Sequence, residues 1–130
     1  LGVDRIAKYG QLFGFGGLTG IEVPGEEKGI LPSEEWKIQR FGEKWYPGET
    51  LSVSIGQGYW SVTPLQLAVS MMGIANGGKI YRPHIIRKVV DPLSGGQKDF
   101  TTVEVKEVGI SEKYLKLISE FSAAVVNEEG

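Results

Sequence analysis

The feature that most constrains the fold is an apolar run from Leu65 to Ala75, in which only Gln66 and Ser70 have polar side chains. The residues around its start form a strong helix signal. Thr63 is a capping residue, Pro64 suits the first helical position, and Gln66 completes a capping box. The sequence therefore predicts a helix that is apolar on nearly all sides and so must be buried on nearly all sides. Such burial needs more surrounding protein than a small two-layer domain supplies.

Helical signals also occur elsewhere in the chain. Residues 3–13 place apolar side chains on one face, and Ser33 is positioned to cap a short helix. Ser111 is positioned to cap a final amphipathic helix. The apolar stripe of that helix consists of Tyr114, Leu115, Ile118, Phe121 and Val125.

Strand signals lie in the second half of the chain. Residues 80–90 and 100–108 are rich in β-branched side chains and are separated by a turn-forming stretch, which predicts a β-hairpin with a partly polar outer face. Residues 45–50 carry a turn signal, and we expect residues 51–59 to be irregular. The predicted class is α+β, dominated by helices and containing one β-hairpin.

Composition excludes several classes of protein. The 130 residues suit one domain or part of one, and 41% hydrophobic and 23% charged residues are typical of a packed globule. The 14 basic and 16 acidic residues give no basic footprint, so nucleic acid is not an expected partner. The absence of cysteine excludes disulfides and thiolate metal sites. Because helical patterns begin and end close to its termini, we expect the chain to be a piece of a longer protein.

Two short motifs suggest nucleotide binding but lack its context. Residues 93–97 spell the LSGGQ pentapeptide of ABC-type ATPases, and residues 73–79 fit most of a P-loop. A P-loop holds phosphate because its glycines lead into a helix N-terminus, whereas these glycines follow a helix C-terminus, where the dipole is negative. Lys79 is followed by Ile80, whereas a P-loop has a serine or threonine at this position, whose hydroxyl binds magnesium. The pentapeptide lies between two strand-like runs, so ATP binding is disfavoured.

Signals for other cofactors and for metals are weak. Residues 14–20 resemble a dinucleotide fingerprint, but the spacing is off by one residue and a helical pattern precedes them. His84 is the only histidine and lacks a cysteine or helical carboxylate partner, so a packed or surface histidine is favoured over a metal ligand. We therefore predict no cofactor and no metal.

Five motifs occur in a specific order: TGIEVPGE (19–26), WYPGET (45–50), SIGQGY (54–59), TPLQLA (63–68) and NGGKIYRPH (76–84). Over nearly the whole chain, this combination resembles the transpeptidase domain of the class B penicillin-binding proteins, especially the elongation-type members. The resemblance implies a serine β-lactamase/transpeptidase-like fold and serine acyl transfer on peptidoglycan. A serine attacks the D-Ala-D-Ala bond of a stem peptide and expels D-alanine. An amine from a neighbouring peptidoglycan strand then attacks the acyl-enzyme, which forms a cross-link. Penicillins acylate the same serine.

The three catalytic motifs of that family are absent from the chain. They are SxxK, SxN or SxD, and KTG or KSG, and no serine here is followed by lysine three positions later. The resemblance places the first two motifs before residue 1 and the third after residue 130. Residues 1–130 are therefore expected to be the central part of the domain, with no internal boundary, no catalytic residue and no activity alone.

The resemblance assigns the loop of residues 55–58 to the substrate cleft beside the nucleophile. Its glycines would let the backbone approach an extended peptide, and Gln57 offers both a donor and an acceptor. Alternatively, the glycines only shape the entrance to the helix at Thr63. We expect Trp45 and Tyr46 to be packing residues or loop anchors. The predicted cleft-lining residues are Ile55, Gly56, Gln57 and Gly58.

Partners and location also follow from the resemblance. The full enzyme would bind peptidoglycan stem peptides and β-lactams and would work with a membrane glycan polymerase. An N-terminal helix outside this chain would anchor it at the periplasmic or extracytoplasmic face of the bacterial inner membrane. The apolar central helix predicts that the chain alone self-associates. A non-catalytic penicillin sensor and, less favoured, a nucleotide-binding module are the alternatives.

Overall fold

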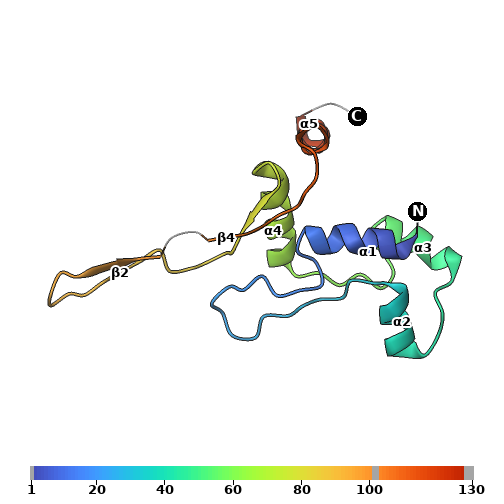
Figure 1. Cartoon of the computed structure of the whole chain (residues 1–130), viewed down its shortest axis with the longest axis horizontal. Coiled ribbons are helices and arrows are strands. Elements are labelled where there is room, and N and C mark those ends of the chain that lie inside the picture. Colours follow the sequence, from blue (N-terminus) through green and yellow to red (C-terminus); the bar gives the residue numbers. More distant parts are fainter. Residues whose placement is uncertain (1, 101–102, 128–130) are drawn as a thin grey trace. The chain divides into compact units, whose positions relative to one another are not determined.

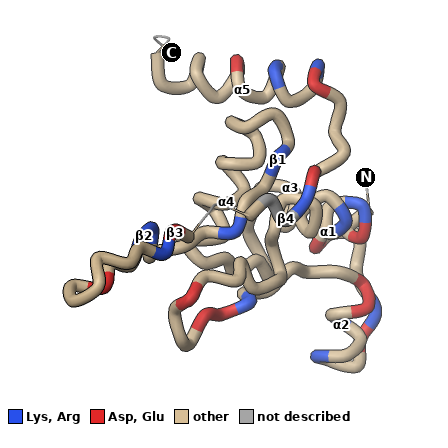
Figure 2. The backbone as a smooth tube through the Cα atoms, turned by 60° about the vertical axis from the view of Figure 1, so that its left-hand side comes forward, with Lys and Arg blue, Asp and Glu red and all other residues tan. Residues whose placement is uncertain are grey.

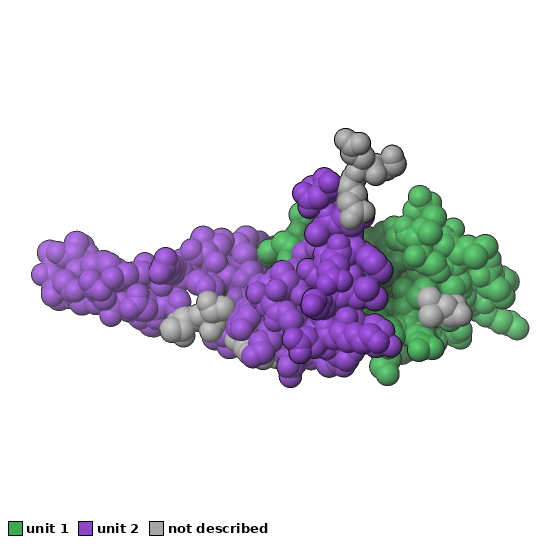
Figure 3. Space-filling model, turned by 90° about the horizontal axis from the view of Figure 1, so that it is seen from above, with its two compact units in different colours: residues 1–18, 27–70 green, residues 19–26, 71–130 purple. Residues whose placement is uncertain are grey.

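The computed structural model describes residues 2–100 and 103–127 (Figure 1). The chain divides into two compact units, which Figure 3 shows in different colours. Unit 1 comprises residues 1–18 and 27–70, and unit 2 comprises residues 19–26 and 71–130. The elements are α1 (Val3–Leu12), α2 (Glu34–Phe41), α3 (Pro47–Ser54), α4 (Pro64–Ala75), β1 (Lys79–Tyr81), β2 (Lys88–Val90), β3 (Gln97–Asp99), β4 (Glu104–Glu107) and α5 (Glu112–Asn127).

The first two helices of unit 1 form where the sequence predicts them. α1 buries Val3 and Ala7, which lie one turn apart on the predicted apolar face. The hydroxyl of Ser33 accepts a hydrogen bond from the backbone N–H of Trp36 at 3.0 Å, so the predicted N-cap of α2 is confirmed. Asp4 ties the two helices together, because its carboxylate accepts from the first backbone N–H of α2 at 3.0 Å.

Residues 47–54 form the helix α3, so the prediction of a turn and an irregular segment is wrong for this stretch. Pro47 occupies the first helical position, where its missing N–H has no cost. Two residues later, the carboxylate of Glu49 accepts from the backbone N–H of Tyr46 at 2.9 Å. These N-terminal signals outweigh the poor helix propensity of Gly48 and Thr50.

α4 begins with the predicted capping box. The hydroxyl of Thr63 accepts from the N–H of Gln66 at 3.1 Å, and the amide oxygen of Gln66 accepts from the N–H of Thr63 at 2.9 Å. Gln66 is 0% exposed, and its amide nitrogen also donates to the carbonyls of Gly17 and Lys28, each at 2.8 Å. One side chain therefore joins the start of α4 to two loops of unit 1.

The described residues do not bury α4 on nearly all sides, which agrees with the prediction that its burial needs more protein than this chain supplies. Val69 and Ser70 are buried, but Leu67 and Met71 are 48% and 50% exposed. The physical reason is that the chain supplies too few elements to surround a helix whose whole circumference is apolar. One apolar face of α4 is left open.

Unit 2 contains the predicted antiparallel pairing in two separate pieces. β1 pairs with β4, with Ile80 opposite Lys106, and β2 pairs with β3, with Val89 opposite Lys98. Between the two pieces lies Pro83, which has no N–H to donate, so a continuous ladder cannot pass through it. Residues 101–102 of the predicted second strand lie outside the described residues. All residues of β2 and β3 are exposed, so this outer piece has no buried face.

The last helix and one loop complete unit 2. α5 follows Ser111, whose carbonyl accepts from the N–H of Leu115 at 3.2 Å, and Leu115 is buried. The other members of the predicted stripe are all exposed on this chain. In the loop of residues 19–26, the carboxylate of Glu26 accepts from the backbone N–H and hydroxyl of Thr19 and from the N–H of Gly20. This carboxylate closes the loop on itself.

Charges of both signs are interspersed along the backbone (Figure 2). α2 begins with Glu34 and Glu35 and has Arg40 in its last turn, an order that complements the helix dipole. Within the part of the chain that the structure describes, no helix has the length and apolar character needed to cross a membrane.

Candidate functional site

The predicted cleft loop, residues 55–58, directly follows α3. Ile55 is the C-cap of that helix, and Gly56 and Gly58 have φ angles of 75° and 74°. The chain turns back sharply, because the N–H of Gln57 donates to the carbonyl of Ser52 at 2.9 Å. The loop is therefore a tight closure of the C-terminus of α3.

The backbone angles explain why both flanking residues are glycine. A Cβ atom at Gly56 would meet nothing within 4 Å, and one at Gly58 would come no nearer than 3.5 Å, to the Cβ of Ser52. Crowding therefore does not require glycine at either position. The positive φ angles do, since an L-residue in this conformation costs about 1 kcal/mol. This geometry suits both a substrate-binding loop and a loop that only shapes the approach to α4.

The loop is open to solvent. Ile55 is 71% exposed, and Gly56, Gln57 and Gly58 are also exposed. The amide of Gln57 is thus not sealed in the interior. Its donor and acceptor groups are accessible to an incoming polar chain.

An apolar hollow of about 260 Å³ lies beside the loop in unit 1. Trp60 is fixed on its wall, because the indole N–H donates to the carbonyl of Val53 at 3.0 Å and the ring packs edge-on against Phe15. Gly56 joins the loop to this hollow. Its lining residues are Phe15, Gly56, Trp60, Val62 and Leu67.

Unit 1 also contains a group of hydrogen-bonded side chains that we call the Lys37 cluster: Lys37, Glu49 and Tyr59. The ammonium of Lys37 donates to both carboxylate oxygens of Glu49, at 2.5 and 2.7 Å. The hydroxyl of Tyr59 donates to the same carboxylate at 3.0 Å. The Lys37 side chain is only 2% exposed and lies 4.3 Å from the ring centroid of Tyr46. Trp45 packs against Tyr59, as expected for a packing residue.

Sequence reasoning missed the Lys37 cluster. The capping position of Glu49 after Pro47 was a usable signal for α3, but no sequence periodicity pairs Glu49 with Lys37 on a different helix. Burial by itself lowers the pKa of Lys37, but the hydrogen bond to Glu49 and the charge of Glu49 outweigh it, so this pKa is raised. The hydrogen bond from Lys37, followed by that from the backbone of Tyr46, lowers the pKa of Glu49. The pair is therefore ionised at neutral pH.

The nucleotide-like motifs fold as the sequence analysis predicts. The glycines of residues 73–79 lie at the C-terminal end of α4, where the N–H of Gly78 donates back to the carbonyl of Gly73 at 2.7 Å. The first four residues of the LSGGQ pentapeptide lie in the connection between β2 and β3, and its Gln97 begins β3; Asp91 and Gly96 close the connection with a backbone hydrogen bond of 2.8 Å. Neither glycine motif opens a helix, so neither can present a helix N-terminus to phosphate.

His84 is half-buried, and its Nδ1 lies 3.1 Å from the carbonyl oxygen of Ile86. Over residues 2–100 and 103–127, no three His, Asp or Glu side chains are grouped so as to hold a metal ion.

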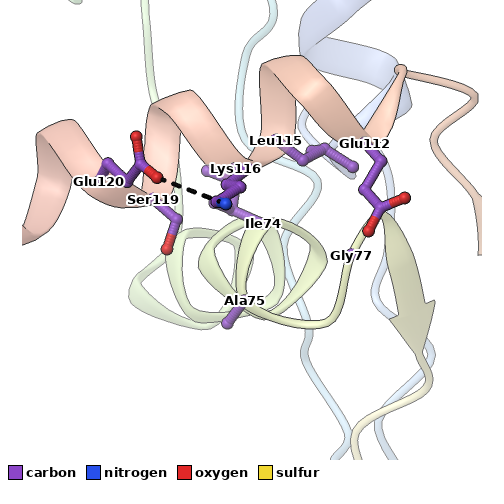
Figure 4. Close-up of a pocket in the computed structure, with 8 residues that line it drawn as sticks. All are labelled: Ile74, Ala75, Gly77, Glu112, Leu115, Lys116, Ser119 and Glu120. Atoms are coloured by element: carbon purple, nitrogen blue, oxygen red, sulfur yellow. Dashed lines mark ion pairs between the residues drawn. The ribbon is translucent and has the colours of Figure 1, made fainter.

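A second hollow, of about 390 Å³, lies in unit 2 between the end of α4 and α5 (Figure 4). Lys116 and Glu120 on α5 are 4.0 Å apart across one helical turn, and both are exposed. A pair of this kind contributes about 0.3–0.5 kcal/mol to the stability of a helix. The presence of Lys116 and Glu120 at this hollow is therefore explained by their pairing and does not indicate a ligand. The candidate site is therefore the loop of residues 55–58, which the resemblance assigns to the substrate cleft and which is exposed in the structure.

The comparison with known proteins identifies the family to which this fold belongs. The chain belongs to the penicillin-binding protein family: residues 1–130 match its transpeptidase domain. It is similar to the peptidoglycan D,D-transpeptidase MrdA of Escherichia coli K12, with 40% identity over 91 residues, which is 70% of this chain and 14% of that protein.

Two solved structures of penicillin-binding protein 2 (PBP2) share the fold. PBP2 of Helicobacter pylori, in its complex with MreC, has a TM-score of 0.80 at 30% identity, over 99% of this chain and 22% of that one. PBP2 of Pseudomonas aeruginosa has a TM-score of 0.79 at 34% identity, over 97% of this chain and 28% of that one. The resemblance drawn from the motifs and the α+β class are confirmed, and the chain spans only 14% of its MrdA relative.

Proposed function

We propose that this chain forms a wall of the substrate cleft in a peptidoglycan D,D-transpeptidase that cross-links stem peptides by serine acyl transfer and is acylated by β-lactams. The observation that carries the proposal is the exposed loop of residues 55–58, held at the end of α3 with Gly56 and Gly58 in the left-handed conformation that favours glycine. The 40% identity to a D,D-transpeptidase supports the reaction type.

In this proposal the chain supplies binding groups, and another part of the parent polypeptide supplies the covalent chemistry. The chain would lie between the second and third catalytic motifs of one transpeptidase domain, and its two compact units would both be parts of that domain. A serine outside it attacks the carbonyl carbon of the D-Ala-D-Ala bond, and the amine of the terminal D-alanine leaves with a proton. The amine of a second strand then attacks the acyl-enzyme, loses a proton and releases the serine hydroxyl.

Gln57 has the clearest task in this scheme. Its amide can donate to a carbonyl and accept from an N–H of an extended peptide, so it would hold the stem peptide in line with the serine. Because Gly56 and Gly58 have no side chains, they would let the peptide backbone approach closely. Ile55, which is also exposed, would provide apolar contact at the rim of the cleft.

Acylation of the full-length protein by a fluorescent penicillin tests this role. We expect Gln57→Ala to slow acylation about tenfold, a typical cost of losing a positioning contact, while the melting temperature stays unchanged. Gln97→Ala is the matched control, because Gln97 is exposed on β3 in unit 2. Equal acylation rates for Gln57→Ala and the unaltered protein would reduce Gln57 to a spacer. Stoichiometric labelling of the isolated 130 residues would show that the nucleophile lies within them.

The proposal extends to location and partners. The parent protein would be anchored by an N-terminal helix, with this domain on the periplasmic or extracytoplasmic face of the bacterial inner membrane, where it would bind stem peptides and work with a membrane glycan polymerase. Fractionation of cells that produce the full-length protein should place it in the inner membrane. Recovery in the soluble cytoplasmic fraction would contradict this location.

A further inference from the structure

We propose that the Lys37 cluster is a positioning device that fixes the conformation of the loop of residues 55–58 for substrate. This inference deepens the proposed function and rests on it. Tyr59 of the cluster directly follows Gly58 in the chain, and Glu49 lies on the helix that precedes the loop, so the effect of the cluster on substrate would pass through the segments that flank the loop.

The geometry of Glu49 carries the argument. Glu49 lies in the first turn of α3, the helix that leads into the loop, and Tyr59 is the first residue after the loop. The hydrogen bond of 3.0 Å from the Tyr59 hydroxyl to the Glu49 carboxylate therefore joins the start of the helix that precedes the loop to the residue that follows the loop. The indole of Trp60 donates to the carbonyl of Val53 at 3.0 Å, which makes a second link, from the last turn of α3 to the segment after the loop.

Lys37 fixes this junction to the rest of unit 1. It reaches from α2 and donates to both oxygens of Glu49, so the carboxylate can neither rotate nor withdraw without breaking a charged hydrogen bond. The ammonium lies among the aromatic rings of Trp45, Tyr46 and Tyr59, at 5.9, 4.3 and 5.9 Å from their centroids. These rings restrict the side chain of Lys37 as well.

A buried ion pair of this kind restrains the conformation of the segments that it joins more than it stabilises the fold. Removing a lysine from water is costly, and well-packed apolar residues often stabilise a protein as well as a buried ion pair does. The conformation of the loop has to be restrained by residues outside it. A Cβ at Gly56 would meet nothing within 4 Å, so packing there is loose, and glycine has the widest choice of backbone angles. The Lys37 cluster supplies that restraint from the segments that flank the loop.

The test is Tyr59→Phe in the full-length protein, since it removes one hydroxyl and keeps the ring and the Lys37–Glu49 pair. Tyr46→Phe is the matched control: it removes a hydroxyl from the same aromatic group but leaves the link to Glu49 intact. Single-turnover acylation by a fluorescent penicillin, corrected for the fraction of active sites, separates the acylation rate constant from the dissociation constant. A merely structural role would lower the active fraction and leave this rate constant unchanged.

We expect Tyr59→Phe to lower the acylation rate constant about fivefold, because a shift well below 1 Å in a positioning group is enough to have this effect. Tyr46→Phe should have no effect. In a Gln57→Ala background, Tyr59→Phe should cause little further loss, because both act through the same loop. If Gln57→Ala slows acylation but Tyr59→Phe does not, or if the two losses multiply, the positioning proposal is overturned and the proposed function stands. If Gln57→Ala itself has no effect, both fall.

Discussion

Gln66 should be the most sensitive polar position of unit 1. Its side chain makes three hydrogen bonds: it accepts from the N–H of Thr63 and donates to the carbonyls of Gly17 and Lys28. Because it is 0% exposed, no water can take over these bonds when the amide is removed. Gln66→Met keeps most of the volume and removes all three bonds.

The expected cost follows from the number of bonds lost. Each net hydrogen bond is worth about 1 kcal/mol, so Gln66→Met should destabilise the start of α4 by about 3 kcal/mol. That loss corresponds to roughly a hundredfold change in the opening equilibrium. Thr63→Ala is the matched control, because it removes only the capping bond that the Thr63 hydroxyl accepts and should cost about 1 kcal/mol.

Native-state hydrogen exchange of the full-length protein measures this effect locally. The protection of backbone amides in α4 should fall about a hundredfold in Gln66→Met and about fivefold in Thr63→Ala. A decrease of less than about threefold in Gln66→Met would show that the three hydrogen bonds do not hold the loops and the helix together.

Two further predictions concern unit 2 and the open face of α4. Burial raises the pKa of Glu26, but hydrogen bonds from Thr19 and Gly20 outweigh it, so the pKa lies below its ordinary value of 4.5. The carboxylate of Glu26 therefore stabilises the loop of residues 19–26 fully above pH 4.5, and this stabilisation is lost as the pH falls through the lowered pKa. The protection of the Thr19 amide from hydrogen exchange should fall in the same pH range. Protection that does not depend on pH would contradict this prediction. We also expect the isolated 130 residues to self-associate through the apolar face of α4 that includes Leu67 and Met71, so their sedimentation coefficient should rise with concentration. Leu67→Lys should reduce this association. A monomer whose sedimentation coefficient does not change with concentration would contradict the prediction.

The elements predicted best are those with a local signal at their first turn. α2 and α4 begin at Ser33 and Thr63, where a side chain satisfies a backbone N–H that the helix cannot. The strand pairing in residues 80–108 was also predictable, because β-branched runs flanked a turn. The sequence analysis missed α3 because its start, Pro47-Gly48, also suits a turn. Glu49 indicates a helix instead of a turn only when its capping position is considered together with Pro47 at the first helical position.

Features that depend on packing were beyond local reasoning. The pairing of Lys37 with Glu49 exists only because α2 and α3 bring the two side chains together, and no spacing in the sequence encodes that distance. The burial of α4 was predicted from its own composition, but exposure is set by what surrounds a helix. The candidate loop was found through family resemblance, and the glycine-rich sequence around Gln57 alone left its role open between binding and shape.

The carboxylate of Glu49 has one more consequence, which comes from its lone pairs. Oε1 accepts from Lys37 and Tyr59, and Oε2 accepts from Lys37 and the backbone of Tyr46. A carboxylate has about four acceptor positions, so this one is saturated. Neither a water molecule nor a substrate proton can find a vacant site on it, and glutamine cannot replace glutamate without turning an amide N–H against another donor.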